Sequence, residues 1–164
     1  MKPLCTALLL ITALIAVPLA RADARDWSLL DTNGESFRLS SSLGTGPVLL
    51  IFWATWCIPC KKEMNDLKDT FDSLAEKGVQ VILVSEDTKR TQAQVKPYVE
   101  SKGYAWRALL DPDGQVLKRY SGTSLPYTVL LDKDGKSVLK IRGAIQDVAA
   151  LKTRAEQLVG AQSE

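Results

Sequence analysis

The sequence of 164 residues has no histidine and only three cysteines, at positions 5, 57 and 60. Without histidine there is no imidazole to serve as a metal ligand or as a catalytic base near neutral pH. Cysteines spaced as Cys57 and Cys60 also begin many structural zinc sites, but such a site needs four ligands. The other cysteine, Cys5, lies in a segment that we expect to be removed. The sequence therefore disfavours a zinc site and predicts no metal ligands.

The sequence also lacks a strong charge imbalance and any sign of a second module. It contains 21 lysines and arginines against 19 aspartates and glutamates, which is a formal net charge of +2. Domains that bind nucleic acids usually have a clustered excess of basic residues, so we expect no nucleic-acid partner. No internal repeat, low-complexity tract or linker rich in Gly, Ser and Pro interrupts the chain. A single domain is therefore expected.

The longest apolar run lies at the N-terminus, where residues 4–17 are apolar apart from two threonines. Lys2 precedes this run and Ala20-Arg21-Ala22 follows it, so the positive, apolar and small-residue regions of a signal peptide are present. We predict a signal peptide over residues 1–22, a domain over residues 23–164 and a location in the periplasm. The alternative is an uncleaved anchor in the inner membrane, with the domain facing the periplasm, because the run approaches the ~17 residues of the shortest spans. Contact with the membrane is expected only in that case.

The other two cysteines fall at a predicted junction between a strand and a helix. Residues 48–52 form a continuous apolar run, which is typical of a strand buried on both faces. Apolar residues then recur at helical spacing over residues 64–74, and Gly78 ends the pattern. This arrangement places Cys57 at the mouth of a helix and Cys60 one turn inside it.

Their position predicts a redox role for the two cysteines. The N-terminus of a helix has unpaired N–H groups and a positive partial charge, so it stabilises a thiolate placed there. We therefore expect Cys57 to be the nucleophile and Cys60, which is close enough to form a disulfide with it, to resolve a mixed disulfide with substrate. Pro59 fits the first helical turn and stiffens the segment between the thiols. A redox-active Cys57–Cys60 disulfide, with no other cofactor, is the predicted reactive group.

A third candidate follows the next predicted strand. Residues 79–84, apolar apart from Gln80, are a second candidate for a buried strand, so strand, helix and strand make a parallel unit. The carboxyl ends of such strands face the functional crevice of an open α/β sheet, which places Glu86 near the cysteines. We predict that partial burial raises the pKa of Glu86 and that it acts as a base for Cys60; the alternative is a solvated loop acid. The neighbouring Asp87 is expected to have little effect on activity.

The remaining pattern predicts further elements of one α/β domain. Asn33-Gly34 between two short alternating segments indicates a hairpin over about residues 27–39. A capping-box pattern at residues 91–94 predicts a helix to about Lys102, in which Pro97 either causes a kink or delays the start. Later segments are predicted as strands over residues 106–110, 128–132 and 137–141, and as a helix from Asp147 to Gly160.

The segment Trp53-Ala54-Thr55-Trp56-Cys57-Ile58-Pro59-Cys60 resembles the active site of the thioredoxin superfamily. The closest resemblance is to the TlpA/ResA-like extracytoplasmic thiol-disulfide oxidoreductases, and it covers about residues 26–160. It implies a thioredoxin-like α/β fold in which helices flank a central mixed sheet. It also implies an N-terminal β-hairpin and an inserted α/β segment between the CxxC helix and a loop with a cis-proline.

The resemblance also assigns roles to single residues. Pro126 matches the cis-proline that faces the CxxC motif in thioredoxin folds, and Leu125 before it would offer backbone groups to an extended substrate segment. Glu86 matches a glutamate that ResA-like proteins have near the thiols. Of the two tryptophans in the motif, Trp53 is expected in the core and Trp56 is expected to be exposed for contact with substrate.

The predicted function is reduction of protein disulfides outside the cytoplasm. The expected partners are proteins with disulfides, and apocytochrome c, periplasmic enzymes and other oxidoreductases all stay open as substrates. A membrane thiol transporter or a thioredoxin-like electron donor would restore the dithiol. The alternatives are a disulfide-forming oxidase of the same fold and a non-catalytic carrier of metal or thiol groups. The lack of histidine weakens the copper-carrier alternative, because thioredoxin-fold copper carriers use one.

Overall fold

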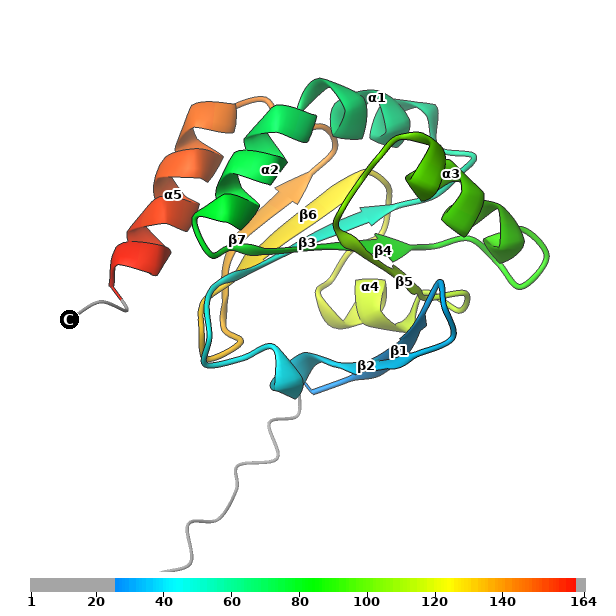
Figure 1. Cartoon of the computed structure of the whole chain (residues 1–164), viewed down its shortest axis with the longest axis horizontal. Coiled ribbons are helices and arrows are strands. Elements are labelled where there is room, and N and C mark those ends of the chain that lie inside the picture. The colour runs from blue at the N-terminus through cyan, green and yellow to red at the C-terminus, as the bar shows by residue number, and fades with distance from the viewer. Residues whose placement is uncertain (1–25, 162–164) are drawn as a thin grey trace, which may run out of the picture.

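The structure is a computed structural model, and it describes residues 26–161 (Figure 1). The predicted signal peptide and Cys5 lie outside the described residues. No helix within residues 26–161 has both the length and the apolar character that crossing a membrane requires.

Seven strands form one mixed sheet in the order β2-β1-β5-β4-β3-β6-β7. The central strands β3, β4 and β5 are parallel to one another, whereas every other neighbouring pair is antiparallel. This is the mixed sheet that the resemblance implied. The strands are β1 (Ser28–Asp31), β2 (Ser36–Arg38), β3 (Val48–Trp53), β4 (Gln80–Ser85), β5 (Arg107–Leu110), β6 (Tyr127–Leu131) and β7 (Ser137–Arg142).

Helices cover both faces of the sheet, as Figure 1 shows. Four of them, α1, α2, α3 and α5, lie over one face, and the short α4 lies over the other. Their bounds are α1 (Ile58–Asp66), α2 (Lys68–Glu76), α3 (Val95–Ser101), α4 (Gln115–Arg119) and α5 (Val148–Gly160).

All six residues of β3 are buried, because the strand lies between two hydrophobic cores. Leu49, Ile51 and Trp53 pack into the core under α1, α2 and α5. Leu50 and Phe52 point to the opposite face, where the core includes residues of α4 and the β1–β2 hairpin. Full burial of each such side chain stabilises the fold by about 1.5–3 kcal/mol. The predicted apolar run over residues 48–52 is therefore a strand buried on both faces.

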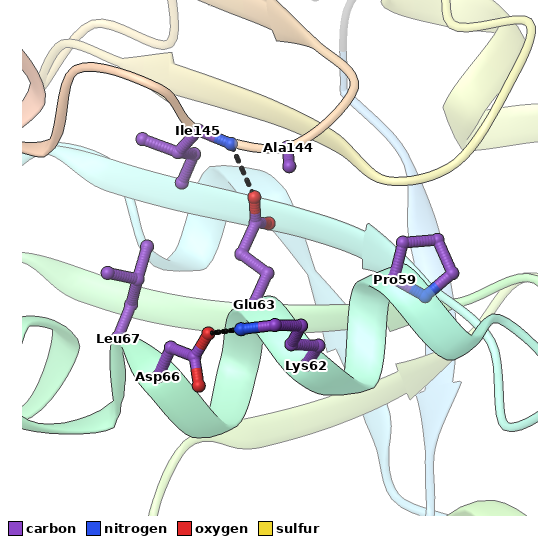
Figure 2. Close-up of a pocket in the computed structure, with 7 residues that line it drawn as sticks. All are labelled: Pro59, Lys62, Glu63, Asp66, Leu67, Ala144 and Ile145. Atoms are coloured by element: carbon purple, nitrogen blue, oxygen red, sulfur yellow. Dashed lines mark hydrogen bonds and ion pairs between the residues drawn. The ribbon is translucent and has the colours of Figure 1, made fainter.

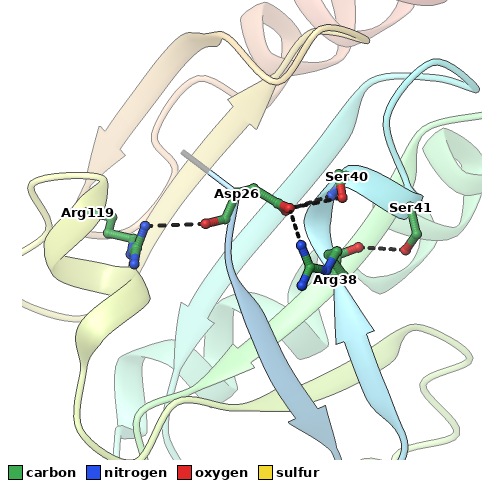
Figure 3. Close-up of polar contacts among 5 residues, drawn as sticks. All are labelled: Asp26, Arg38, Ser40, Ser41 and Arg119. Atoms are coloured by element: carbon green, nitrogen blue, oxygen red, sulfur yellow. Dashed lines mark hydrogen bonds and ion pairs between the residues drawn. The ribbon is translucent and has the colours of Figure 1, made fainter. Parts of the chain in front are cut away.

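Asp26, the first described residue, forms hydrogen bonds to the segment that ends the hairpin and to α4 (Figure 3). The Asp26 carboxylate accepts hydrogen bonds from the Ser40 backbone N–H and from the Ser40 hydroxyl, and it pairs with Arg38 at 3.0 Å. Arg119 donates to the Asp26 carbonyl at 3.4 Å. Burial opposes ionisation, but the hydrogen bonds from Ser40 and Arg38 outweigh it and lower the pKa of Asp26. The next residue, Trp27, is buried and donates to the Tyr120 hydroxyl.

The structure differs from the predicted elements in three places. The single helix expected after the cysteines is divided at Leu67 into α1 and α2, although residues 61–77 contain no proline or glycine. The capping box expected at residues 91–94 is wrong, because Thr91 makes no capping hydrogen bond. The α-helix begins at Val95 with Pro97 in its first turn, so the delayed start, one of the two expected effects of Pro97, is confirmed. Helix α4 was not predicted, since five residues are too short to show a helical period.

Candidate active site

The active-site loop connects β3 to α1, the predicted junction between a strand and a helix. The Cys57 N–H donates to the Ala54 carbonyl at 3.0 Å, which closes a turn directly before the helix. Cys57 is the N-cap of α1, with extended backbone angles (φ −83°, ψ 96°), and Pro59 lies in the first helical turn. Proline fits there because its missing N–H would have had no helical partner.

The two cysteines form a disulfide with a Cα–Cα distance of 5.3 Å. The Cys57 Sγ also accepts a hydrogen bond from the Cys60 N–H at 3.3 Å, so this sulfur occupies the capping position at the positive end of α1. Cys57 is 5 % exposed and Cys60 is 1 % exposed. The predicted placement of the pair, one cysteine at the mouth of the helix and one a turn inside, is confirmed.

Apolar side chains stand out from the surface on both sides of Cys57. Trp56 is 60 % exposed and Ile58 is 74 % exposed, whereas Trp53 is fully buried. The expected placement of the two tryptophans, one in the core and one on the surface, is confirmed. An exposed tryptophan beside a reactive sulfur offers a large contact area to an incoming polypeptide.

The loop before β6 lies beside the end of β3. The Leu125–Pro126 peptide bond is cis, as the resemblance implied. Tyr127, the next residue, pairs with Phe52 of β3, which brings Pro126 close to the loop that contains the cysteines. The Pro126 carbonyl accepts a hydrogen bond from the Gly143 N–H at 3.0 Å. Leu125 is half-buried.

Glu86 follows β4 and is held to the neighbouring strand, because its N–H donates to the Trp53 carbonyl at 2.8 Å. Burial, and then the nearby Asp111, raise its pKa from 4.5 to about 8, while Lys118 acts in the opposite direction. The predicted rise in the pKa is confirmed. The carboxyl group faces α4, however, where a methyl group at Gly114 would come within 3.1 Å of the Glu86 Oε2 atom.

A buried glutamate, Glu63, which the sequence analysis missed, lies one helical turn after Cys60. The side chain of Glu63 points from α1 towards the loop before α5, where its Oε2 atom accepts a hydrogen bond from the Ile145 N–H at 2.5 Å (Figure 2). Its Oε1 atom is buried with no partner among the described residues. Burial raises the pKa of Glu63, and the Ile145 N–H partly offsets the rise. The i, i+3 spacing from Cys60 was a signal that could have revealed it.

Glu63 also lines a pocket beside the motif. The pocket has a volume of about 220 Å³ and extends from the first turn of α1 to the loop before α5 (Figure 2). It is lined by Pro59, Lys62, Glu63, Asp66, Leu67, Ala144 and Ile145. A carboxyl group with a raised pKa at the wall of an open pocket is able to exchange a proton with solvent or with a bound molecule.

Asp87, which was expected to have little effect on activity, lies in the interior of the protein. Its side chain is fully buried, and its carboxylate accepts hydrogen bonds from the Thr55 N–H at 2.7 Å and from the Thr55 hydroxyl at 2.6 Å. The Ser85 hydroxyl donates a further hydrogen bond at 2.8 Å. The Asp87 side chain is therefore tied to the active-site loop, which argues against the expectation that changing it has little effect on activity.

Within residues 26–161 there is no group of three or more Cys, His, Asp and Glu side chains that would hold a metal ion. The chemistry that the described site supports is thiol–disulfide exchange. It combines a disulfide at a helix N-terminus, two carboxyl groups with raised pKa values and an exposed apolar rim.

Comparison with known proteins points to the same chemistry. Residues 20–140 match the AhpC/TSA family. The chain is 35 % identical over 126 residues to thiol-disulfide oxidoreductase ResA of Bacillus subtilis, which covers 77 % of this chain and 69 % of the relative. It is also 35 % identical over 121 residues to ResA of Bacillus thuringiensis subsp. konkukian, which covers 74 % and 68 %.

Solved structures with the same fold include redox proteins. One is the thioredoxin domain of a thiol-disulfide oxidoreductase from Bacteroides vulgatus, with a TM-score of 0.66 and 26 % identity over 79 % of this chain and 93 % of that one. Another is a protein from Chlorobium tepidum described as a thiol:disulfide interchange protein DsbE, with a TM-score of 0.67 and 26 % identity over 85 % and 94 %.

Proposed function

Because this chain belongs to the AhpC/TSA family and is a thiol-disulfide oxidoreductase of the thioredoxin fold, we propose that it reduces protein disulfides outside the cytoplasm. The observation that carries the proposal is the capping position of the Cys57 sulfur at the N-terminus of α1. The helix terminus stabilises the thiolate form, which is the form that attacks a disulfide.

The reaction proceeds in two exchange steps. The Cys57 thiolate attacks one sulfur of the substrate disulfide, so that a mixed disulfide forms and one substrate thiolate leaves. Cys60, once deprotonated, attacks the Cys57 Sγ atom, which releases the second substrate thiolate and forms the Cys57–Cys60 disulfide. Two electrons have then passed to the substrate. A dithiol donor must return them before the next cycle.

The buried Cys60 needs a base before the second step, and two carboxyl groups are candidates. Glu86 follows the strand next to β3, as the sequence analysis proposed, and its pKa of about 8 suits proton exchange near neutral pH. Glu63 is on the same helix as Cys60, one turn away, and its pKa is also raised. We propose that one of these two glutamates is the base: Glu63 lies on the helix of Cys60, whereas the carboxyl group of Glu86 faces α4.

The substrate contacts that we propose surround Cys57. Trp56 supplies an exposed aromatic surface. The Pro126 carbonyl is already used by Gly143, so Leu125 would supply the backbone groups that pair with an extended substrate segment. Pro59 keeps the first turn of α1 in shape between the two sulfurs. The substrate class is a protein with an accessible disulfide, and apocytochrome c is one possibility.

We further propose that residues 1–22 direct export, with residues 23–164 forming the thioredoxin-like domain in the periplasm. An anchor in the inner membrane facing the periplasm is the alternative arrangement. The support is the pattern of charge and apolar residues at the N-terminus. In either arrangement the reductant is a membrane thiol transporter or a thioredoxin-like protein, because the periplasm keeps exposed dithiols oxidised without one.

The redox state of the Cys57–Cys60 pair in cells tests the direction of electron flow. Rapid acid quenching, alkylation of free thiols and electrophoresis separate the reduced and oxidised forms. A reductase is kept mostly reduced in an oxidising compartment, so we expect mostly alkylated protein in the periplasmic fraction. A mostly oxidised pair would instead favour a disulfide-forming oxidase of the same fold.

A further inference from the structure

A buried carboxylate joins the end of β4 to the turn before Cys57. It takes no part in the two thiol–disulfide exchange steps of the proposed reaction. Asp87 lies two residues after β4 and has no exposed surface. Its Oδ1 atom accepts from the Thr55 hydroxyl at 2.6 Å, and its Oδ2 atom accepts from the Thr55 N–H at 2.7 Å. The Ser85 hydroxyl donates to Oδ2 at 2.8 Å. Burying a carboxylate costs much free energy unless such donors are present, so the fold depends on these hydrogen bonds.

Thr55 belongs to the turn that leads into the reactive sulfur. This turn runs from Ala54 to Cys57 and is closed by the hydrogen bond from the Cys57 N–H to the Ala54 carbonyl. It sets the point from which the Cys57 Sγ atom accepts the Cys60 N–H at 3.3 Å. Asp87 holds Thr55 by both its backbone and its side chain. The turn therefore cannot move away from β4 without leaving the buried carboxylate with only the Ser85 hydroxyl of these three donors.

We propose that Asp87 is a positioning residue for the redox reaction, because it fixes the turn that places the Cys57 sulfur on the N-terminus of α1. It acts through Thr55 rather than on substrate. The inference rests on the proposed role of Cys57 as the nucleophile. Without the link the sulfur would lose its alignment with the helix terminus, so a smaller fraction would be thiolate at a given pH and its attack would be less well directed.

The chain contains a control, a second buried aspartate whose contacts lie away from the active-site loop. The Asp31 carboxylate accepts hydrogen bonds from two backbone N–H groups, those of Asn33 at 2.8 Å and Glu35 at 3.0 Å, and it pairs with Arg107 at 3.6 Å. These bonds shape the turn between β1 and β2 rather than the active-site loop. Removing Asp31 therefore removes the same kind of interaction from a part of the fold that does not contain the cysteines.

The test measures the rate at which iodoacetamide alkylates the reduced protein as a function of pH, with the modified cysteine identified by mass spectrometry. The variants are Asp87→Ala, Thr55→Val, Thr55→Ser and Asp31→Ala. We expect Asp87→Ala and Thr55→Val to move the midpoint for Cys57 up by about half a pH unit, the size of one helix-terminus interaction. We expect kcat/KM with insulin to fall by about 10- to 100-fold, as for a misplaced reacting group.

Thr55→Ser keeps both donors to Asp87, so it should restore the wild-type midpoint and rate. Asp31→Ala should lower the melting temperature without moving the midpoint. If Asp87→Ala, or Thr55→Val where the first variant does not fold, keeps the wild-type midpoint and kcat/KM, then Asp87 has only a structural role and the inference is wrong. Alkylation of Cys60 before Cys57 in the wild-type protein would instead overturn the proposed function, independently of Asp87.

Discussion

Cys57 and Cys60 differ in their surroundings, and this difference predicts different effects when each is changed. Cys57→Ser removes the sulfur at the helix terminus, so reduction of insulin disulfides should be abolished. Cys60→Ser leaves the attacking sulfur in place but removes the more buried sulfur that resolves the mixed disulfide. We therefore expect Cys60→Ser to accumulate substrate adducts on non-reducing gels, with the double variant as the control. Adducts with Cys57→Ser and none with Cys60→Ser would reverse the two roles.

The base for Cys60 is tested by changing each glutamate to glutamine, which keeps the shape and removes proton exchange. If Glu63 is the base, Glu63→Gln should slow the resolving step by about 10²-fold, and the same holds for Glu86→Gln if Glu86 is the base. Stopped-flow measurement of substrate-thiol release in a single turnover follows this step. A wild-type rate for both variants would show that neither carboxyl group deprotonates Cys60.

The pH dependence of stability gives a separate prediction for Glu86. Its pKa is about 8 in the folded protein against 4.5 in the unfolded chain, so folding takes up a proton between these values. The contribution of Glu86 to stability is therefore lost progressively as the pH rises from about 4.5 to about 8.

Glu86→Gln should remove that part of the pH dependence. Denaturant unfolding should show the variant gaining on the wild type as the pH is raised from 5 to 8, with most of the gain present at pH 8. The pKa of Glu63 is raised as well, so the stability of the Glu86→Gln variant should still fall somewhat as the pH rises. An equal difference in stability at pH 5 and pH 8 would contradict a raised pKa at Glu86.

At the scale of the elements, the loops that enter β3 and β4 come into close contact. A methyl group on Gly46 would lie 2.4 Å from the backbone carbonyl oxygen of Gly78, and a backbone atom cannot turn aside as a side chain does. We expect Gly46→Ala to destabilise the protein by about 1–3 kcal/mol in denaturant unfolding. Gly160→Ala is the control, because that position in α5 has open space around it. Equal stability of the two variants would show that the loops separate easily.

Two of the helices show which elements local sequence pattern can predict and which it cannot. Helix α5 was expected to begin after Asp147, and the Asp147 carboxylate does accept the Ala150 N–H at 2.8 Å. Helix α4 was missed because its cap comes from outside the helix: the Asp111 carboxylate accepts the backbone N–H groups at the start of α4. A capping residue followed by a long periodic segment is visible in sequence, but a five-residue helix is not.

At the scale of the whole molecule, the redox potential reflects the balance between the dithiol and the disulfide. Ile58 and Pro59 bring neither a charge nor an extra side-chain donor to the thiolate, so the helix terminus is its main stabilisation. We expect a potential of roughly −220 to −280 mV, near that of thioredoxin and far from the about −120 mV of the strong oxidant DsbA. Equilibration with glutathione measures it. A value above about −160 mV would support the oxidase alternative.

The sequence by itself determined the strands and the reactive pair. The buried run of β3, the helix that starts at Cys57 and the strand before Glu86 each depend on residues close together in the chain, and local pattern encodes such features. The resemblance added the mixed sheet and the cis peptide bond at Pro126, neither of which periodicity contains. The assignment of thiol–disulfide chemistry followed from the position of Cys57 and Cys60 at the start of a helix and from the lack of further zinc ligands.

Only the tertiary structure decided which acidic residues belong to the site. Asp87 had been expected to matter little, and Glu63 had passed unnoticed on a helix rich in charged residues. Asp87 is buried because Thr55, 32 positions earlier in the chain, meets it across the ends of β3 and β4. Glu63 is buried because Ile145, 82 positions later, covers it. The burial of a carboxyl group depends on contacts between segments that are distant in the chain, and burial in turn affects the pKa. The sequence shows where the acidic residues are, but it does not show which of them are shielded from water.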